Sequence, residues 1–207
     1  MPSIPDSEYR ARTEAVQANI REAGLDACVV HANEAEAANV RYLTEYWPTF
    51  EAAGVFVPAE GKPVLLSGPE SETYAAGRSK VPDIHKMVEY RESAEPQYPR
   101  VQVSTFQDVA RAAMGDKPLR KIGLVGYSIM PLPVYMSLKE QFPDAELIKA
   151  DHTFLPLRFV KSQAEIACIR RAYEISEIAV QAILDEIMPG MTELQVIGIA
   201  QREIYAH

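Results

Sequence analysis

The stretch Gly24-Leu-Asp-Ala-Cys-Val-Val-His31 joins the end of a helix to a short apolar run. Glycine favours the left-handed backbone conformation in which many helices end, so Gly24 predicts the end of a helix. The run from Asp26 to His31 has the length and apolar content of a buried strand. Before it, Pro5-Asp6-Ser7 supplies capping residues, and apolar side chains at helical spacing form one face of the predicted helix: Tyr9, Val16, Ile20 and Ala23.

After this strand, short apolar runs alternate with helical segments. Residues 54–57 and 63–66 flank Pro58-Ala-Glu-Gly61, whose turn-forming residues predict a β-hairpin. Further strands are expected at 84–90, 121–126 and 145–149, and helices or helical turns at 33–40, 69–76, 104–114 and 131–142. The third of these helices begins at a capping box of Ser104 and Gln107. Alternating strands and helices predict an α/β domain, and the hairpin makes its sheet mixed.

The pattern changes after Asp151. Residues 153–160 predict an irregular connector that proline interrupts, and Ser162 with Glu165 forms a capping box for a long helix. A stripe at alternating steps of three and four runs along that helix: Ile166, Ile169, Tyr173, Ser176, Val180, Ile183 and Ile187. Another capping box, Thr192 with Gln195, begins a second helix that still runs at the last residue. We expect a second, incomplete domain from about residue 160.

Composition excludes several classes of protein. The 207 residues carry 21 basic and 29 acidic side chains, a net charge of −8, and no basic stripe, so we expect no nucleic-acid partner. No apolar run approaches the ~18 residues that span a bilayer, and the N-terminus lacks the pattern of a signal peptide. Cys28 and Cys168 lie far apart in apolar stretches. They are interpreted as free thiols of a cytoplasmic protein, rather than as a disulfide or a reactive thiol.

Candidate catalytic groups are sparse. None of the four histidines belongs to a metal-binding motif. Glu203 and His207 stand four residues apart and could share a helix face as metal ligands, although a solvated helix end is favoured. Asp83 with His85 suggests a surface hydrogen bond, and Gly123-Leu-Val-Gly126 lacks the spacing of a phosphate-binding loop. The residues alone therefore predict no catalytic and no metal-binding site in this chain.

The segment from Asn39 to Phe50 is different, because it holds four aromatic residues, one of which is the single tryptophan of the chain, Trp47. Aromatic loops beside rigid elements often contact ligands or partners. The alternative is that Tyr42 and Leu43 belong to the core and that the rest of the segment is a loop that acts only as a plug.

Three stretches together resemble the creatinase / prolidase / aminopeptidase P family of pita-bread metallohydrolases. The first joins Ala23-Gly-Leu-Asp-Ala-Cys-Val-Val30 to Asn39-Val-Arg-Tyr-Leu-Thr44. The second is Arg158-Phe-Val-Lys-Ser-Gln-Ala-Glu-Ile-Ala167 with the following Ile169-Arg170, and the third is Met188-Pro-Gly-Met-Thr-Glu193. Their order and spacing match the family across essentially the whole chain. Glu45 departs from the pattern, since many relatives carry glycine there, and this leaves the subfamily open.

The resemblance implies a mixed six-stranded sheet flanked by helices, of the ribonuclease-H-like type. It places this N-terminal domain at residues 1–152, a linker at 153–160, and the first helices of a truncated α+β pita-bread domain at 161–207. In the family, two divalent metals, commonly Mn, Co or Zn, are held by two Asp, one His and two Glu on later strands. No catalytic or metal residue is therefore assigned in this chain, which is expected to be inactive alone and to hold no cofactor.

The resemblance also implies a function for the parent protein. We expect a metal-dependent hydrolase of peptide-like C–N bonds, foremost an Xaa-Pro dipeptidase or aminopeptidase, that acts on a peptide or small-amide substrate. A creatinase-like amidinohydrolase and a non-catalytic binding module remain alternatives. In this family one subunit's N-terminal domain commonly reaches towards its neighbour's active site. Trp47, Phe50 and Glu51 are therefore candidates for a substrate cap supplied across a homodimer.

Overall fold

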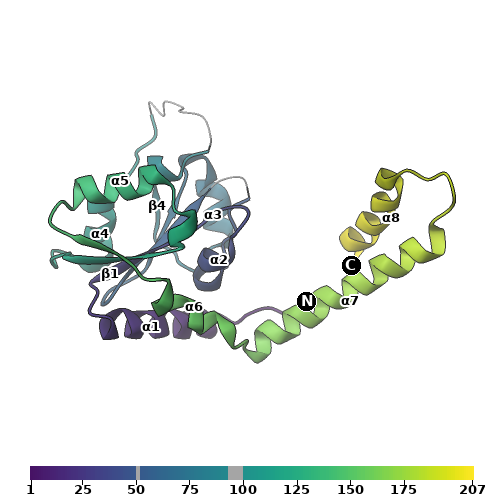
Figure 1. Cartoon of the computed structure of the whole chain (residues 1–207), viewed down its shortest axis with the longest axis horizontal. Helices are drawn as coiled ribbons and strands as arrows, with labels where there is room; N and C mark the ends of the chain where they lie inside the picture. Colours follow the sequence, from purple (N-terminus) through teal and green to yellow (C-terminus); the bar gives the residue numbers. More distant parts are fainter. Residues whose placement is uncertain (50–51, 93–99) are drawn as a thin grey trace. The chain divides into compact units, whose positions relative to one another are not determined.

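The computed structural model describes residues 1–49, 52–92 and 100–207. The chain forms two compact units, one of residues Asp6–Val160 and one of Lys161–His207 with Met1–Pro5. The first unit is a sheet covered by helices, and the second is a helical hairpin (Figure 1). None of the helices in the described ranges is both long enough and apolar enough to cross a membrane.

A six-stranded mixed sheet forms the centre of the first unit, as the sequence predicts. Its strands are β1 Ala27–Ala32, β2 Ala53–Pro58, β3 Val64–Ser67, β4 Ile84–Lys86, β5 Lys121–Val125 and β6 Glu146–Lys149. They lie in the order β4-β3-β2-β1-β5-β6. The pairs β1–β2 and β2–β3 are antiparallel, while β1–β5, β3–β4 and β5–β6 are parallel.

Helices cover both faces of this sheet. One face packs against α1 Asp6–Glu22, α2 Ala38–Thr44, α3 Glu72–Arg78 and α6 Asp151–Phe159, and the other against α4 Phe106–Met114 and α5 Leu132–Gln141. Because both faces are covered, β1 is buried along its whole length and its sequence is a continuous apolar run. Cys28 is free and fully buried in this strand, and burial raises the pKa of its thiol to about 12. Cys168 is also free.

Three local predictions were wrong. The helix expected at 33–40 lies at 38–44 instead, so it extends into the aromatic segment. The strand expected at 84–90 ends at Lys86, because the chain turns through a short 3-10 helix at Val88–Tyr90 that brings Tyr90 into the core. The capping box of α4 is Thr105 with Asp108, not Ser104 with Gln107. The Ser104 hydroxyl instead contacts Nδ1 of His85 at 2.9 Å.

The predicted irregular connector at 153–160 was also wrong, since α6 is helical from Asp151 to Phe159 with Pro156 inside it. Proline removes one backbone donor from a helix, but contacts to the rest of the unit compensate here. Phe154 is fully buried in the core, and the side chain of Asn19 in α1 donates to the carbonyl of Thr153 at 2.8 Å. The first unit therefore includes α6.

The second unit consists of α7 Gln163–Glu186 and α8 Glu193–Ala206. Both predicted capping boxes are confirmed, with Ser162 and Thr192 as the N-caps. The two helices pack against each other, but only Ala179 and Ile199 are buried between them. The rest of their apolar side chains are partly or largely exposed.

Candidate functional site

The structure separates the aromatic segment into a buried and an exposed part. Leu43 and Tyr46 are fully buried, as a core plug requires, whereas the side chain of Trp47 is 48% exposed. The guanidinium of Arg41 lies 4.6 Å from the centre of the indole ring, which places a cation against one face of it. Trp47 is thus held at the surface. The other two predicted cap residues, Phe50 and Glu51, lie outside the described residues.

The position of Trp47 depends on how α2 ends. Glu45 follows the helix with φ +64°, the left-handed conformation that glycine favours, and its N–H donates to the carbonyl of Arg41 at 2.9 Å. Glu45 is the residue that departs from the family pattern, and it nevertheless adopts the backbone expected of the glycine. Its carboxylate lies 3.4 Å from Nζ of Lys80, which also contacts Asp6 at 3.0 Å.

Two of the stretches that carry the family resemblance meet in the structure. The side chain of Asn39 accepts a hydrogen bond from Arg158 and donates to the carbonyl of His31 at 3.2 Å. The hydroxyl of Tyr42 donates to the carbonyl of Leu157 at 3.1 Å. These bonds hold α2 against α6. The residues that resemble the family at these positions therefore make contacts that stabilise the fold.

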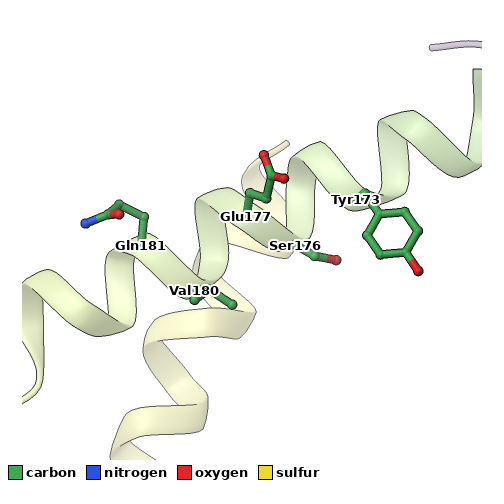
Figure 2. Close-up of a pocket in the computed structure, with 5 residues that line it drawn as sticks. All are labelled: Tyr173, Ser176, Glu177, Val180 and Gln181. Carbon is green, nitrogen blue, oxygen red and sulfur yellow. The ribbon is translucent and has the colours of Figure 1, made fainter.

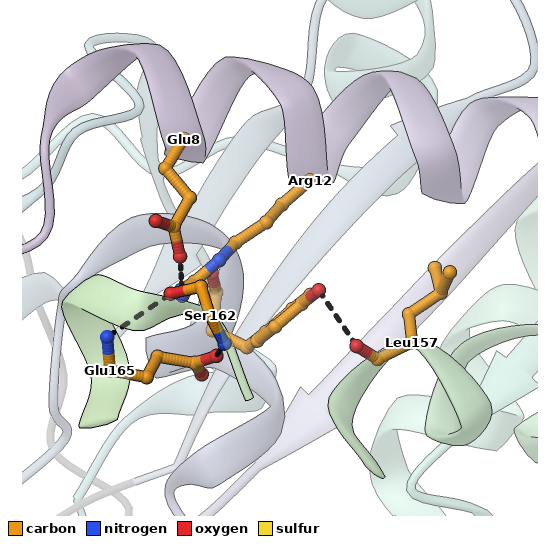
Figure 3. A network of polar contacts seen from close by, with 6 residues as sticks. Glu8, Arg12, Leu157, Ser162 and Glu165 are labelled. Atoms are coloured by element: carbon orange, nitrogen blue, oxygen red, sulfur yellow. Dashed lines mark hydrogen bonds and ion pairs between the residues drawn. The ribbon is translucent and has the colours of Figure 1, made fainter. Parts of the chain in front are cut away.

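Arg12 completes this arrangement from α1. It forms an ion pair with Glu8 (Figure 3). It also donates to the carbonyl of Tyr42 at 2.9 Å and lies 4.3 Å from the centre of the Tyr42 ring. A nearly buried arginine is stabilised by such a set of partners, since an unpaired buried charge is costly. Arg12 was assigned no role from the sequence, because nothing in its local pattern distinguishes it from an exposed helix residue.

The carboxyl ends of the parallel neighbours β1 and β5 are occupied by the chain itself. Such a place commonly binds ligands in α/β proteins when the following segments leave to opposite faces, as α2 and α5 do. Here Asp151 accepts a hydrogen bond from the N–H of Gly126 at 2.9 Å. Gly126 has φ +76°, and a Cβ there would lie 2.6 Å from the carbonyl oxygen of His31. Neither this close packing nor the spacing of Gly123 and Gly126 is typical of a phosphate-binding loop.

A buried polar pair lies at the same edge of the sheet. The rings of His31 and Tyr90 are 5.7 Å apart, both side chains are fully buried, and in the described part of the chain their polar atoms have no hydrogen-bond partner. Burial lowers the pKa of His31 to about 4 and raises the pKa of Tyr90. His31 is therefore neutral at pH 7. The sequence marked it only as the end of a strand.

Acidification should destabilise the protein through His31. The unfolded chain takes up a proton near pH 6.5 and the folded chain only near pH 4. Above pH 6.5 the imidazole is neutral in both states and does not lower the free energy of unfolding. As the pH falls from 6.5 towards 4, only the unfolded chain takes up the proton, and the free energy of unfolding falls by about 3 kcal/mol. Urea unfolding of the wild type and of His31→Asn between pH 7.5 and 4 measures the difference. His152→Asn, which removes an exposed imidazole, is the control, and equal pH dependence in all three would contradict the assignment.

Other predicted polar groups do not assemble into a metal centre. Oε2 of Glu203 lies 3.7 Å from Nε2 of His207, and Oδ1 of Asp83 lies 3.4 Å from Nε2 of His85. Each is an isolated pair, and the residues that the structure describes contain no group of three or more side chains able to hold a metal ion.

A hollow of about 350 Å³ runs along α7 (Figure 2). Its lining residues all come from consecutive turns of this one helix: Tyr173, Ser176, Glu177, Val180 and Gln181. The hollow is the open surface of a helix that carries two exposed apolar side chains, Tyr173 and Val180. It has the composition of a packing surface and lacks convergent groups for catalysis.

Comparison with known proteins bears on both units. The sequence model of the Creatinase/Prolidase N-terminal domain matches residues 12–160. The "Uncharacterized hydrolase/peptidase y4tL" of Sinorhizobium fredii is 25% identical over 204 residues, which cover 94% of this chain and 49% of that protein. An Xaa-Pro dipeptidase of Pyrococcus furiosus is 27% identical over 139 residues, covering 67% and 36% respectively. The chain spans half or less of the length of these curated relatives.

The fold is shared with solved structures. The crystal structure of the prolidase from Pyrococcus horikoshii superposes with a TM-score of 0.69 at 19% identity, covering 95% of this chain and 48% of that one. That coverage extends beyond the first unit. The mixed sheet flanked by helices, followed by further helices, is thus a known arrangement.

Proposed function

Because this chain belongs to the Creatinase/Prolidase N-terminal domain family, we propose that it is the N-terminal portion of a longer metal-dependent hydrolase of peptide-like C–N bonds. An Xaa-Pro dipeptidase or aminopeptidase is the activity favoured. The observation that supports this most directly is the family match over residues 12–160, together with the similarity to an Xaa-Pro dipeptidase.

In this proposal, the first unit, Asp6–Val160 with α6 included, is the N-terminal domain, and α7 with α8 are the first helices of the catalytic domain. The similarity to the y4tL protein extends beyond the first unit, which supports the proposal that α7 and α8 belong to the same kind of longer protein. Two divalent metals, Mn, Co or Zn, would bind to residues downstream of this chain. The two free cysteines are consistent with a reducing, cytoplasmic location.

The first unit would serve assembly and access to the active site. Trp47, with Phe50 and Glu51, is proposed to cap a substrate bound by the neighbouring subunit of a homodimer. The half-exposed indole held by Arg41 supports this role, because a preordered aromatic ring can exclude water from a neighbouring site.

The activity is tested on the parent protein with the 207-residue chain as control. We expect Mn-, Co- or Zn-dependent hydrolysis of Xaa-Pro dipeptides by the longer protein, and neither hydrolysis nor bound metal after dialysis of the short chain. Turnover of creatine-like amides alone would favour an amidinohydrolase. Loss of the downstream Asp, His and Glu ligands, with no turnover, would favour a binding module. One tightly bound metal ion per short chain would contradict the proposal.

Trp47→Ala in the longer protein should change KM or kcat by about fivefold, the effect of losing an aromatic contact of about 1 kcal/mol. Because the indole is half exposed, the Tm should shift by less than about 2 °C. Tyr46→Ala, which truncates the buried neighbour, is the control and should lower the Tm strongly. A large loss of Tm with unchanged kinetics in Trp47→Ala would instead identify a core plug.

A further inference from the structure

The pair of Asp83 and His85 is extended by a hydroxyl group from another part of the chain. Nδ1 of His85 lies 2.9 Å from Oγ of Ser104, while Nε2 of the same ring lies 3.4 Å from Oδ1 of Asp83. Ser104 stands 19 residues after His85, so only the tertiary structure brings the hydroxyl to the ring. Asp83, His85 and Ser104 are called the β4 triad below.

Backbone hydrogen bonds fix the β4 triad along the outer strand of the sheet. His85 lies in β4, and the carbonyl of Asp83 accepts a hydrogen bond from the N–H of Leu65 in β3 at 2.9 Å. The N–H of Ser104 donates to the carbonyl of Lys86, the last residue of β4, at 2.7 Å. The hydrogen bonding of the sheet therefore holds the backbones of all three residues beside one another.

The triad has the order of groups that activates a serine in hydrolases, which is carboxylate, imidazole and hydroxyl. A carboxylate beside one ring nitrogen favours the tautomer that carries its proton there, and the other nitrogen then accepts a hydrogen bond. In His85 the Nε2–H faces Asp83, and the hydroxyl of Ser104 donates to Nδ1. An imidazole in this position can take the hydroxyl proton as the oxygen attacks an electrophile.

Small reagents can reach this hydroxyl from solution. The side chains of Asp83 and His85 are 43% and 18% exposed, and Ser104 is partly exposed. The N-cap of α4 is the next residue, Thr105, and the positive end of the helix dipole favours a nearby negative charge. Asp108 already accepts a hydrogen bond from the N–H of Thr105, so that donor is not available to a developing oxyanion. A slow acylation is therefore expected, without rapid turnover.

We propose that Ser104 is a nucleophile that accepts an acyl group from small activated esters, with His85 as its general base and Asp83 as the residue that positions the imidazole. Oγ of Ser104 attacks the carbonyl carbon and forms the new C–O bond, while Nδ1 of His85 takes the hydroxyl proton. The bond from this carbon to the leaving oxygen breaks, and His85 passes its proton to that oxygen, so that an alcohol or phenol departs.

The cycle closes with water. A water molecule attacks the acyl-serine, the carboxylic acid leaves, and Ser104 regains its hydroxyl proton through His85. Every group that this chemistry requires lies in the first unit. The activity is therefore distinct from the hydrolase proposed above, whose metal ligands would lie downstream of this chain.

Acetylation by p-nitrophenyl acetate tests the proposal on the 207-residue chain. The reaction is stopped with acid at several times, and peptide mass spectrometry identifies the acetylated residues. Ser176 is the internal control, because its exposed hydroxyl donates to the backbone carbonyl of Ala172 at 2.9 Å. The acetyl group should accumulate on Ser104 at least about 100-fold faster than on Ser176, the lower end of what a positioned general base supplies.

Substitutions assign the roles within the triad. His85→Gln removes the base and should slow acetylation of Ser104 to about the rate at Ser176. Asp83→Asn should slow it at least about tenfold, whereas Asp83→Glu restores a carboxylate and should recover most of the rate. His152→Gln removes an exposed imidazole elsewhere in the first unit and is the matched control, with no change expected. Circular dichroism verifies that each variant folds.

Three results would overturn the proposal. In the first, Ser104 and Ser176 of the wild type are acetylated at equal rates, a comparison that requires no variant. In the second, Ser104 reacts as fast in His85→Gln as in the wild type, which would assign its reactivity to the end of α4 alone. In the third, the acetyl group is found only on lysines. Equal rates in Asp83→Asn and Asp83→Glu would remove Asp83 from its positioning role.

Discussion

Replacing Gly54 by alanine is expected to destabilise the first unit by about 3 kcal/mol, the upper end of the usual range for an overpacked core. A Cβ at this position would lie 2.4 Å from Oη and 2.8 Å from Cζ of Tyr90. Tyr90 is fully buried against the sheet, so its ring has no free space to move into. The new methyl group therefore forces a shift of the ring or of β2.

Urea unfolding measures this effect, and two variants sharpen it. Gly77→Ala is the matched control, because nothing lies within 4 Å of a Cβ there and alanine favours the helix, by about 0.5–1 kcal/mol. Tyr90→Phe combined with Gly54→Ala removes the closer contact and should recover part of the stability. A Gly54→Ala protein within about 1 kcal/mol of the wild type would show that β2 and Tyr90 separate easily.

The exposed apolar face of α7 and α8 should drive self-association of the chain. Val180 and Leu184 are 55% and 66% exposed on α7, and the neighbouring helix exposes Leu194 and Tyr205 further still. Full burial of an apolar side chain stabilises by roughly 1.5–3 kcal/mol, so a face of this size forfeits on the order of 10 kcal/mol in water. Monomeric proteins rarely leave such a face uncovered. We expect it to pair with the same face of another chain.

Val180→Ser with Leu184→Ser should abolish this association. Glu177→Ser with Gln181→Ser, an equally spaced pair on the same helix, should leave it intact. Light scattering and limited proteolysis of residues 161–207 provide the readouts. Apolar pairing should persist in high salt. Equal behaviour of the two serine variants, with a monomeric wild type, would show that the face stays exposed.

Truncation provides a second test, and the structure determines where it must be made. A chain that ends near Asp151, where the sequence pattern changes, would lose α6 and the buried Phe154. A chain that ends at Val160 keeps the first unit whole. It should lose the apolar pairing and keep the fold of the first unit.

Short-range patterns predicted most of this fold. The hairpin, the central strand at Ala27–Ala32 and the capping boxes at Ser162 and Thr192 depend on residues close in sequence, and all are confirmed. The wrong predictions lie where contacts between residues far apart in the sequence determine the local structure. Pro156 predicted an irregular segment, yet Phe154 in the core and the bond from Tyr42 to Leu157 maintain a helix there.

The candidate site was only partly predictable for the same reason. Composition identified Trp47 as unusual, but its exposure and its contact with Arg41 depend on the left-handed turn at Glu45. Tyr74 and Arg78 were missed, because they lie on a short helix whose pattern is ordinary, and Tyr74 meets the ring of Tyr46 only through tertiary packing. The burial of His31 follows from coverage of both sheet faces, and an isolated strand gives no sign of that.

The helix α6 has a consequence for synthesis on the ribosome. Asn19 in α1 donates to the carbonyl of Thr153 at 2.8 Å, and Arg158 donates to Asn39, so the beginning of the unit is bonded to its end. A domain folds as a unit during translation, once all the residues of its core are available. The nascent chain therefore cannot complete the packing of α1 before residue 158 has been synthesised. Until then the core cluster that contains Val16 and Ile20 is missing the side chain of Phe154. A pause in translation before that codon should extend the lifetime of an open, chaperone-binding intermediate.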